Sequence, residues 1–600
     1  MDDTNSLIEQ RRAKLKALEA RGIFPFKNKF TPAETCQQAR DHYVEGREVS
    51  VAGRITAHRD MGKSMFIDVR DQSGRLQCYA QKNVLGEEQF LIFRHLDLGD
   101  FIGAKGTLFT TKTGEISIKL SSFTILAKAL RPLPGKWHGL EDTEIRYRQR
   151  YLDLISNPEV KDVMLKRSAI IREIRDFFHG RGYVEVETPM MQPIPGGAAA
   201  QPFKTHHNAL GCDFYLRIAL ELYHKRLLVG GIDRLFEIGK NFRNEGLSRR
   251  HNPEFTMLEA YCAYGDYASM METVETLITT IAKKVLGTLV IEHGWNALAR
   301  VIEGTLAQLN RLEDKTIVDL VKKRSGAEAE NFNSNVKVWR ENLVKCKNSQ
   351  GKQSIQAAFE DADRWINDLM IGISLERASF QNSKEDALGK LSQELAELEK
   401  YFSSVKHQLE LGKREAKIIN LTPNWRRAKY RDLVREKAGA DWFEVTPAER
   451  RRRAIEDLKL GGDIAATYED FEVTGAVFEK LIETTLINPT FVTHLPKELV
   501  PLAKLTPDDP TTVEVFECCI NGQEISPGYT EQNDPVAQRA ALEHQAGGEQ
   551  QKLDEDFLVA LEHGMPPAGG IGIGIDRLCM MLLGQESIRD VILFPQLKPK

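Results

Sequence analysis

The stretch RLFEIGKNFRNEGLSRRHNPEFTMLEAY, residues 234–261, predicts two β-strands joined by a basic loop. Successive side chains of a strand point to opposite faces, so every second residue shares a face. One face of the first strand would carry Glu237, Asn241, Arg243 and Glu245. One face of the returning strand would carry Phe255, Met257, Glu259 and Tyr261. The stretch therefore predicts an antiparallel hairpin with one polar, partly aromatic face.

The residue types of this hairpin suit a nucleotide. The guanidinium of Arg243 can form a fork with a phosphate, and the ring of Phe255 can stack on a purine. Arg249, Arg250 and His251 in the loop can meet further phosphates. A ladder of structural ion pairs is the alternative interpretation of the same residues.

The segment GGIGIGIDRLCMMLLG, residues 569–584, alternates glycine with isoleucine. We expect the isoleucines to point into the core, while the glycines let a ligand lie close to the backbone. Asp576 is expected to cap the following helix, and Arg577 in its first turn would point toward the nucleotide. The chain has no GxxxxGK[ST] phosphate loop and no GxGxxG motif, so a nucleotide must be held in another way.

A third cluster lies in VEVFECCINGQEISPGYTEQND, residues 513–534. Glu517 and Glu524 offer the hard oxygen ligands that Mg²⁺ uses beside substrate phosphates. Tyr529 and Glu531 are two residues apart on an extended segment and so share a face. Solvent-exposed glutamates with no function are the alternative for each of these carboxylates.

The composition excludes several classes of protein. The 600 residues carry 82 Lys+Arg against 86 Asp+Glu, a formal net charge of -4, so binding through bulk positive charge is excluded. At about 100–200 residues per domain the length implies three or four domains. The eight cysteines show no zinc spacing, and no run of about 18 apolar residues occurs. We expect a cytoplasmic protein with reduced cysteines and no membrane contact.

Residues 49–135 read as five short β-branched strands, which predict a small OB-fold barrel after an N-terminal helix and lead-in over residues 1–48. Such a barrel binds single-stranded nucleic acid on its sheet face. Suitable side chains are Arg54, Phe66, Gln77 and Glu115. A purely structural barrel with Phe66 in its core is the alternative. The helix predicted from Ser6 to Gly22 is basic, so it could contact phosphates or simply face the solvent.

Residues 294–411 interrupt two strand-like segments, TLVIEH and KIINL, that would form a hairpin if joined. Apolar residues three and four apart predict a helical hairpin or small bundle. The two longest rows are Leu388, Leu391, Leu395, Leu398, Phe402, Val405 and Leu409, and Ile355, Phe359, Ala362, Ile366, Leu369 and Ile373. The balanced charge of this insertion argues against an RNA-binding role, although an inert bundle, a partner site, a tRNA contact and an engineered addition all stay open.

Several motifs together resemble a known family. FRNEG with RHNPEF resembles motif 2 of class II aminoacyl-tRNA synthetases, GIGIGIDR resembles motif 3, and GYVEVETPM resembles motif 1. The segments RPLPGKWHGLEDTEIRYRQRYLDLI, PGGAAAQPFKTHHNAL and YLRIALELYHKRL narrow the resemblance to bacterial-type class II lysyl-tRNA synthetases. The resemblance implies an α+β fold with an anticodon-binding barrel, a catalytic domain over residues 136–293 and 412–600, and the insertion at 294–411.

The resemblance also implies a role for each matching residue. Catalysis would rest on Arg243 and Arg577, and ATP would contact Arg243, Glu245, Arg250, His251, Asn252, Phe255 and Arg577. Mg²⁺ would be held by Glu517 and Glu524. The lysine pocket would comprise Gly197, Glu221, Glu259, Tyr261, Tyr529 and Glu531. Phe66, Gln77 and Glu115 would read the anticodon of tRNA(Lys).

The resemblance further implies a homodimer formed through motif 1 and a role in protein synthesis. Pro527 departs from the family pattern, which has an asparagine there, and this puts one polar lysine contact in doubt. A synthetase for aspartate or asparagine is disfavoured, because an acidic substrate would need a cationic pocket and not Glu221 with Glu531. A non-catalytic RNA-binding or regulatory protein derived from a synthetase is the other alternative. A protein-lysylating paralogue is disfavoured because such proteins typically lack the barrel.

Overall fold

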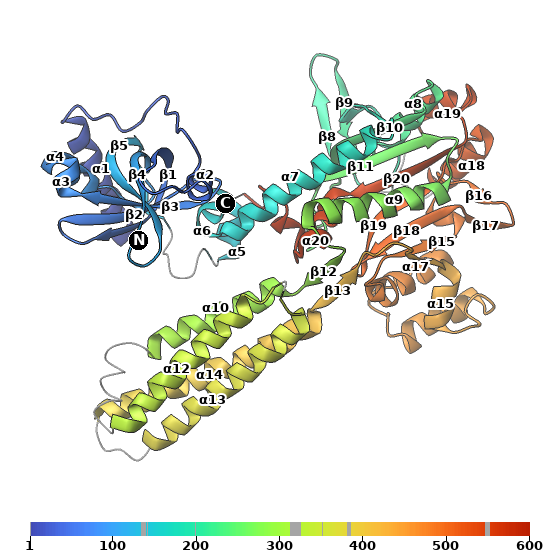
Figure 1. Ribbon diagram of the computed structural model, residues 1–600. Helices are drawn as coiled ribbons and strands as arrows, with labels where there is room; N and C mark the ends of the chain where they lie inside the picture. The colour runs from blue at the N-terminus through green and yellow to red at the C-terminus, as the bar shows by residue number, and fades with distance from the viewer. Residues whose placement is uncertain are drawn as a thin grey trace. The chain divides into compact units, whose positions relative to one another are not determined.

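The computed structural model describes residues 2–133, 140, 142–198, 200–312, 326–350, 352–380, 386–546 and 553–599 (Figure 1). The chain forms two compact units, Met1–Arg146 with Tyr151–Asn157, and Tyr147–Arg150 with Pro158–Lys600. The boundary expected at residues 135 and 136 lies outside the described residues. No helix within the described ranges is both long and apolar enough to cross a membrane.

The first unit contains a closed five-stranded barrel in the order β1-β2-β3-β5-β4, which confirms the expected OB-fold. Its strands are β1 (Glu48–Asp60), β2 (Ser64–Arg70), β3 (Arg75–Gln81), β4 (Phe101–Thr110) and β5 (Ile116–Ala127). Alternate residues of every strand fill the interior, among them Val51, Ile67, Cys78 and Ile118, each with no exposed surface. The turn signals of the sequence thus close a barrel around one apolar core.

Short helices surround this barrel: α1 (Asp2–Glu19), α2 (Cys36–Asp41), α3 (Lys82–Leu85) and α4 (Glu87–Arg94). Helix α1 begins at Asp2, before the expected Ser6, so the prediction that Ser6 caps it was wrong. Acidic residues favour a helix N-terminus, and Asp2 and Asp3 supply two of them. Arg11 donates to the carbonyls of Ala129 and Arg131 at 2.9 Å, which anchors the helix within its own unit.

The second unit is built on an eight-stranded sheet in the order β14-β15-β18-β19-β20-β11-β10-β6, which confirms the expected α+β class (Figure 1). Only the two outermost pairs are parallel, β14 with β15 and β10 with β6. The strands are β6 (Val184–Glu185), β10 (Arg234–Phe242), β11 (Glu254–Ala263), β14 (Arg426–Lys429), β15 (Thr490–Thr493), β18 (Val515–Ile520), β19 (Gln523–Thr530) and β20 (Ala568–Gly574).

One face of this sheet packs against α7 (Pro158–His179), α9 (Tyr267–Ile281) and α20 (Ile575–Leu583). The amphipathic patterns of these helices supply the main core, and Ile571 and Ile573 of β20 point into it as expected. The opposite face packs in part against two smaller apolar clusters, one that includes Leu235 and Phe557 and one that includes Val492 and Trp442, and carries polar side chains elsewhere. Three further helices of the unit are α8 (Glu221–Val229), α18 (Pro535–Ala546) and α19 (Glu555–Glu562). A small sheet is formed by β7 (Met191–Gln192), β9 (Cys212–Leu216) and β8 (Lys204–His207), and a strand pair by β16 (Leu505–Thr506) and β17 (Asp509–Val513).

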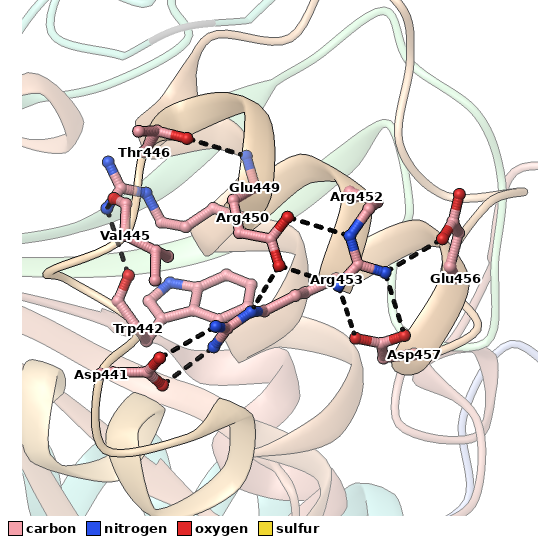
Figure 2. A network of polar contacts seen from close by, with 10 residues as sticks. All are labelled: Asp441, Trp442, Val445, Thr446, Glu449, Arg450, Arg452, Arg453, Glu456 and Asp457. Atoms are coloured by element: carbon pink, nitrogen blue, oxygen red, sulfur yellow. Dashed lines mark hydrogen bonds and ion pairs between the residues drawn. The ribbon is translucent and has the colours of Figure 1, made fainter.

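A helical segment between β14 and β15 is held by arginine–carboxylate pairs (Figure 2). It comprises α15 (Tyr430–Ala438), α16 (Pro447–Arg452) and α17 (Asp470–Leu481). Glu449 accepts hydrogen bonds from Arg452 and Arg453, which hold the pKa of Glu449 at about 2. Arg453 also forks onto Asp441 at 2.9 Å through both terminal nitrogens. These exposed pairs fix the turn geometry more than they stabilise the fold.

The insertion forms a four-helix bundle from α10 (Trp295–Leu312), α12 (Gly326–Lys347), α13 (Ile355–Phe380) and α14 (Asp386–Glu415). The predicted rows of apolar residues build a separate core that includes Phe359, Ile366 and Phe402. The side chains of Leu388 and Leu391, at the start of one row, lie outside the described part of the structure. The insertion was expected to end at Leu411, but helix α14 continues to Glu415. The apolar row itself ends earlier, at Leu409. The bundle thus has a core of its own, as the periodicity predicts.

The bundle is joined to the rest of the second unit through the two-stranded hairpin of β12 (Val290–His293) and β13 (Lys417–Asn420). His293 lies directly opposite Lys417 in this hairpin. The ring of His293 binds the carbonyl of Met581 through Nε2 at 2.7 Å, so the hairpin is anchored to α20. Arg300 of the bundle adds an exposed ion pair with Glu586 at 3.1 Å.

We expect a variant that lacks residues 294–416 to fold. Because His293 and Lys417 are already cross-strand partners, an Asn-Gly turn can join them as a two-residue hairpin loop. The melting temperature should change by less than about 4 °C, since the only deleted ion pair to the sheet unit in the described structure is exposed. ATP affinity, measured by calorimetry, should stay unchanged.

The full-length variant Arg300→Ala is the control, because it removes the tie to Glu586 and leaves the bundle intact. A deletion variant that melts normally but no longer binds ATP would show that the bundle supports the nucleotide site.

Candidate active site

A cavity of about 200 Å³ opens on the polar face of the sheet, at the loop between β10 and β11 and the start of α20. All the residues expected to bind ATP line this one cavity. Its walls comprise Arg243, Glu245, Gly246, Arg250, His251, Asn252, Pro253, Phe255, Met257, Glu524, Ile525, Pro527, Gly574, Asp576, Arg577 and Ile588.

Charged side chains of both signs line this cavity, Arg243, Arg250 and Arg577 beside the carboxylates of Glu245, Glu524 and Asp576. The guanidinium carbon of Arg243 lies 5.2 Å from the centre of the Phe255 ring, and its Nε is buried without a hydrogen-bond partner in the described structure. Burial lowers the pKa of Arg243, and the charges of Glu245 and Glu524 offset part of this shift. Arg250 donates to the carbonyl of Gly522 at 3.1 Å. An anionic ligand would give Arg243 the partner that its Nε lacks.

Arg577 joins the same group from α20. Its Nη2 lies 3.0 Å from Nε2 of His251, and its Nη1 donates to the carbonyl of Glu524 at 3.2 Å. Burial, followed by the charge of Arg577, lowers the pKa of His251, so this ring is neutral at physiological pH and can accept from the guanidinium. The flat ring of Phe255 in the same cavity offers a surface for a base.

Asp576 does not cap α20, contrary to the sequence prediction. The helix is preceded by Gly574, and no side chain caps its first turn. The Asp576 carboxylate is buried, accepts from the backbone N–H of Thr256 at 2.7 Å and pairs with Arg167 at 2.7 Å. Asp576 therefore ties α20 to β11 and α7 and so positions Arg577.

The expected metal ligands Glu517 and Glu524 lie on the neighbouring strands β18 and β19. Glu483, which sequence reasoning missed, joins them by accepting from the backbone N–H of Glu524 at 2.7 Å. Burial, and then the charges of Glu524 and Glu483, raise the pKa of Glu517 well above its usual value. Among the described residues no set of three or more His, Cys, Asp or Glu is arranged to ligate a metal by itself. A cation there would need further oxygens, such as those of phosphates.

A second polar site lies deeper on the same face, around the fully buried Lys225 of α8. Its Nζ lies 2.7 Å from Oε1 of Glu221 and 2.6 Å from Oε2 of Glu531, and it donates to the carbonyl of Leu502 at 3.2 Å. Five of the six residues expected to bind lysine surround this cation: Glu221, Glu259, Tyr261, Tyr529 and Glu531. The sequence interpretation did not predict Lys225 as part of this site. Its position four residues after Glu221, which places both side chains on one face of a helix, was the available signal.

Two glycines make room for these side chains. A Cβ on Gly570 would lie 2.0 Å from Oε1 of Glu531 and 2.6 Å from the Tyr261 ring. Gly197, the sixth expected residue, has φ of +85°, and a Cβ there would press on Ala219 at 3.1 Å and Glu221 at 3.5 Å. The glycines thus let the backbone approach the carboxylates of the site.

The deeper site has more negative than positive groups. Burial raises the pKa of Glu531 to about 8, against the opposing charge of Lys225. Burial also raises the pKa of Glu259, which accepts from the hydroxyl of Tyr261 at 3.0 Å. Because three carboxylates face one lysine, the site is suited to receive one more cation.

Pro527 lies between the two sites. It pairs with Glu517 across the strands and lines the nucleotide cavity. A proline offers no side-chain hydrogen bond there.

The barrel displays aromatic rings on its outer face. Phe66 stacks on Tyr79 with ring centres 4.6 Å apart, and Tyr79 contacts Phe109 at 5.8 Å. Phe66 therefore lies outside the core, contrary to the alternative that placed it there. The sequence interpretation missed Tyr79 and Phe109, although Tyr79 lies opposite Phe66 in the register of β2 and β3.

Polar groups border these rings. Gln77 accepts from the hydroxyl of Ser117 at 2.9 Å. Glu115 accepts from Arg40 at 2.9 Å and from Arg75 at 3.0 Å. Arg54, also considered for this face, instead covers the ring of Phe101 at 4.3 Å.

Comparisons with known proteins match both units. Residues 142–598 match the family model described as tRNA synthetases class II (D, K and N), and residues 49–126 match the OB-fold nucleic acid binding domain. A protein of Pelotomaculum thermopropionicum named lysine–tRNA ligase is 40% identical over 607 aligned positions, covering 100% of this chain and 96% of that protein. Lysine–tRNA ligases of Carboxydothermus hydrogenoformans (40% identical) and Moorella thermoacetica (39% identical) each cover 100% of this chain and 99% of their own length.

The variant Lys225→Met should destabilise the protein by about 3–5 kcal/mol, because it leaves Glu221 and Glu531 buried without their cation. A carboxyl with a raised folded-state pKa loses stability as pH rises from its unfolded value near 4.3 to the folded value. In the wild type that loss ends near the Glu531 pKa of about 8, whereas without Lys225 the pKa is higher and the loss continues. The free energy of unfolding that Lys225→Met loses relative to the wild type, measured with urea, should therefore be larger at pH 9 than at pH 7.

Lys284→Met is the matched control, since Lys284 pairs with Glu173 at 2.8 Å on the surface. Its cost should stay below about 1 kcal/mol and should not depend on pH. An equal loss for both variants would contradict a buried cation at position 225.

Proposed function

The chain belongs to the class II tRNA synthetases of the D, K and N group, and we propose that it is a lysine–tRNA ligase of protein synthesis. The enzyme activates L-lysine with ATP and then transfers lysine to the 3′ end of tRNA(Lys). One observation supports lysine above the other substrates of this group: Glu221, Glu259 and Glu531 converge on a buried site in which Lys225 pairs with Glu221 and Glu531. An aspartate or asparagine substrate would place an acidic or neutral side chain against that negative charge, at a cost of about 2–5 kcal/mol.

ATP binds in the cavity at the loop between β10 and β11. Phe255 stacks on adenine, with Arg577 on the other side of the base, while Arg243 binds the α-phosphate together with the lysine carboxylate. The remaining contacts follow the motif positions, with Glu245 and Asn252 at the adenosine and Arg250 and His251 at the outer phosphates. The unpartnered Nε of Arg243 and the burial of its guanidinium support this assignment.

Mg²⁺ suits the carboxylates of Glu517 and Glu524, whose mutual repulsion a divalent cation would remove. When bound with the phosphates, this ion supplies charge neutralisation for the leaving pyrophosphate. Glu483 holds Glu524 in place by accepting a hydrogen bond from the backbone N–H of Glu524.

Adenylate formation needs positioning and charge neutralisation more than acid–base chemistry. The carboxylate of lysine attacks the α-phosphorus, the bond to the β-phosphate oxygen breaks, and pyrophosphate leaves. Arg243 and Arg577 neutralise the charge on the phosphoryl oxygens in a cavity that is already arranged for it. A ribose hydroxyl at the 3′ end of the tRNA then attacks the lysyl carbonyl carbon, and AMP leaves.

The side chain of the substrate enters the deeper site. Its ε-ammonium binds Glu531 with the help of Tyr261, and Gly197, Glu221, Glu259 and Tyr529 form the rest of the pocket. Burial keeps the pKa of Glu531 high while no substrate cation is present, so the incoming ammonium displaces a proton. A neutral side chain could not compensate the ionised carboxylate.

The barrel reads the uridine-rich anticodon. Phe66 and Tyr79 offer stacked rings to the bases, while Gln77 and Glu115 offer hydrogen bonds to base edges. Supply of charged tRNA to ribosomes places the enzyme in the cytoplasm.

Dimer formation through motif 1 is supported by apolar side chains left in contact with solvent in this region. Val184 of the edge strand β6 is 52% exposed, and Met190 and Met191 are 47% and 53% exposed. A second copy of the chain would cover this patch and the free edge of the sheet.

Glu531→Gln should abolish most lysine-dependent ATP–pyrophosphate exchange. The variant removes one carboxylate charge from the pocket, and we expect kcat/KM for lysine to fall at least about 30-fold. ATP affinity should stay unchanged, because Glu531 lies outside the nucleotide cavity. The exposed Glu562→Gln is the control and should exchange normally. Near wild-type exchange by Glu531→Gln would contradict the assignment of the lysine pocket.

Phe66→Ala should lower kcat/KM for tRNA in aminoacylation by about 10-fold or more, since base stacking on an aromatic side chain contributes about 1–3 kcal/mol. Lysine-dependent exchange should be unaffected because the barrel folds as part of a separate unit. Phe66→Leu keeps apolar bulk without a flat ring, so it should show the same defect with an intact barrel. A loss of exchange in either variant would contradict an anticodon role confined to the barrel.

A further inference from the structure

A histidine lies fully buried beside the lysine pocket. His224 of α8 has no exposed surface, and its Nε2 lies 3.0 Å from Oε2 of Glu237 on β10. Its Nδ1 lies 3.9 Å from Oε2 of Glu259 on β11, and its ring meets the Tyr261 ring at 5.3 Å. Glu237 and Glu259 are themselves cross-strand partners, so the imidazole lies between two adjacent carboxylates.

The first carboxylate is held in its ionised form. Glu237 accepts from the backbone N–H of Thr188 at 3.1 Å and from its hydroxyl at 2.8 Å, and it pairs with Arg217 at 2.7 Å. Burial alone would raise the pKa of Glu237, but hydrogen bonds from His224 and Thr188 and the charge of Arg217 lower it overall. Because an ionised carboxylate can only accept, Nε2 of His224 must carry a proton.

The other ring nitrogen then decides the charge of the imidazole. Nδ1 is buried and has no hydrogen-bond partner within the described structure. In the neutral ring its lone pair would face a carboxylate oxygen of Glu259, which is repulsive. In the imidazolium form the same nitrogen would present a proton to Glu259.

Glu259 is already an acceptor on both of its oxygens. Its Oε2 accepts from the hydroxyl of Tyr261 at 3.0 Å, and its Oε1 accepts from the backbone N–H of Leu220 at 3.3 Å. These contacts favour the carboxylate form, whereas burial and the nearby Glu221 favour the protonated form. A positive charge on His224 would tip this balance toward the carboxylate.

We propose that His224 and Glu259 share one proton that resides on the imidazole, so that Glu259 stays ionised to bind the substrate. The proposal rests on the lysine-binding function and makes His224 a positioning residue of that pocket. In this state the pairs His224 with Glu259 and Arg217 with Glu237 are each neutral. Once the substrate has displaced the proton of Glu531, Glu221 and Glu531 against Lys225 leave one net negative charge, which matches one side-chain ammonium.

The groups facing this imidazole come from every neighbouring element. They are Glu221 and Lys225 on its own helix, Arg217 before that helix, Glu237 on β10, Glu259 and Tyr261 on β11, and Glu531 beyond β19. Arg217 and Lys225 are each paired with other carboxylates, and Arg243, whose charge interacts with that of Glu259, lines the nucleotide cavity. His224 is the basic side chain whose nitrogen lies closest to the Glu259 carboxylate in the described structure, at 3.9 Å.

Calorimetry of lysine binding tests the proposal by counting protons. Binding heats measured at pH 7 in buffers of different ionisation enthalpy give the number of protons released per lysine. In His224→Gln the amide can still donate to Glu237, but no proton is left to share, so Glu259 is protonated before lysine binds. We expect this variant to release roughly one proton more than the wild type and to bind lysine about 10-fold more weakly at pH 7. Its affinity should recover as pH rises.

Thr188→Val is the matched control, because it weakens the anchoring of Glu237 and leaves the imidazole in place. It should release as many protons as the wild type, even if lysine binds more weakly. An equal proton count for His224→Gln and the wild type overturns the shared proton and leaves His224 a packing residue.

The same measurements distinguish a variant that fails to fold, and a failure of the proposed function, from a failure of the role of His224. If His224→Gln does not fold, His224→Asn carries the same expectation, since it also lacks a titrating nitrogen. If the wild type itself shows no lysine binding, the proposed function fails, whereas normal wild-type binding with an unchanged proton count removes only the role of His224.

Discussion

The register of β11 against β20 is the constraint on which both sites depend. Glu259 lies opposite Gly572 and Tyr261 lies opposite Gly570. The polar side chains of β11 therefore lie beside the glycines of β20, which leave space for them. A slip of one residue would turn Glu259 and Tyr261 into the apolar core and bring isoleucines to the ligand side. Because Phe255 and Met257 follow the same alternation, one strand lines the nucleotide cavity at one end and the deeper pocket at the other.

Buried charge is the second constraint, and it follows from the first. The register places Glu259, and through β19 also Glu531, where water does not reach them. An isolated buried carboxylate is too costly to remain ionised, so each must find a cation or take up a proton. Lys225 supplies the cation for Glu531, and His224, the preceding residue of the same helix, lies 3.9 Å from Glu259. In the proposed function, the same desolvation that raises the cost of these charges would make the pocket selective for an ammonium group.

Sequence patterns predicted the local features well. Alternation in residues 234–261 correctly predicted the hairpin of β10 and β11, and alternation in the glycine–isoleucine segment correctly predicted that its isoleucines point into the core. The residues expected to bind the nucleotide line one cavity. Tertiary neighbours were harder to predict. Glu483 reaches Glu524 across 41 residues, and the role of Asp576 depends on Thr256 and Arg167, far away in the chain. Periodicity carries no signal for such contacts, because it reports which face a residue occupies and not what lies opposite.

The insertion shows how a segment such as residues 294–411 can enter this fold. Antiparallel strands end side by side, so a segment placed between β12 and β13 begins and ends at neighbouring points and leaves the strand pairing intact. The bundle buries its own apolar rows, including Leu343, Phe359 and Phe402, and takes nothing from the core of the sheet unit. Yet His293 binds the carbonyl of Met581 in α20, the helix that carries Arg577 near its start. The hairpin that carries the bundle is therefore tied to the helix that carries Arg577, in addition to the exposed pair of Arg300 with Glu586.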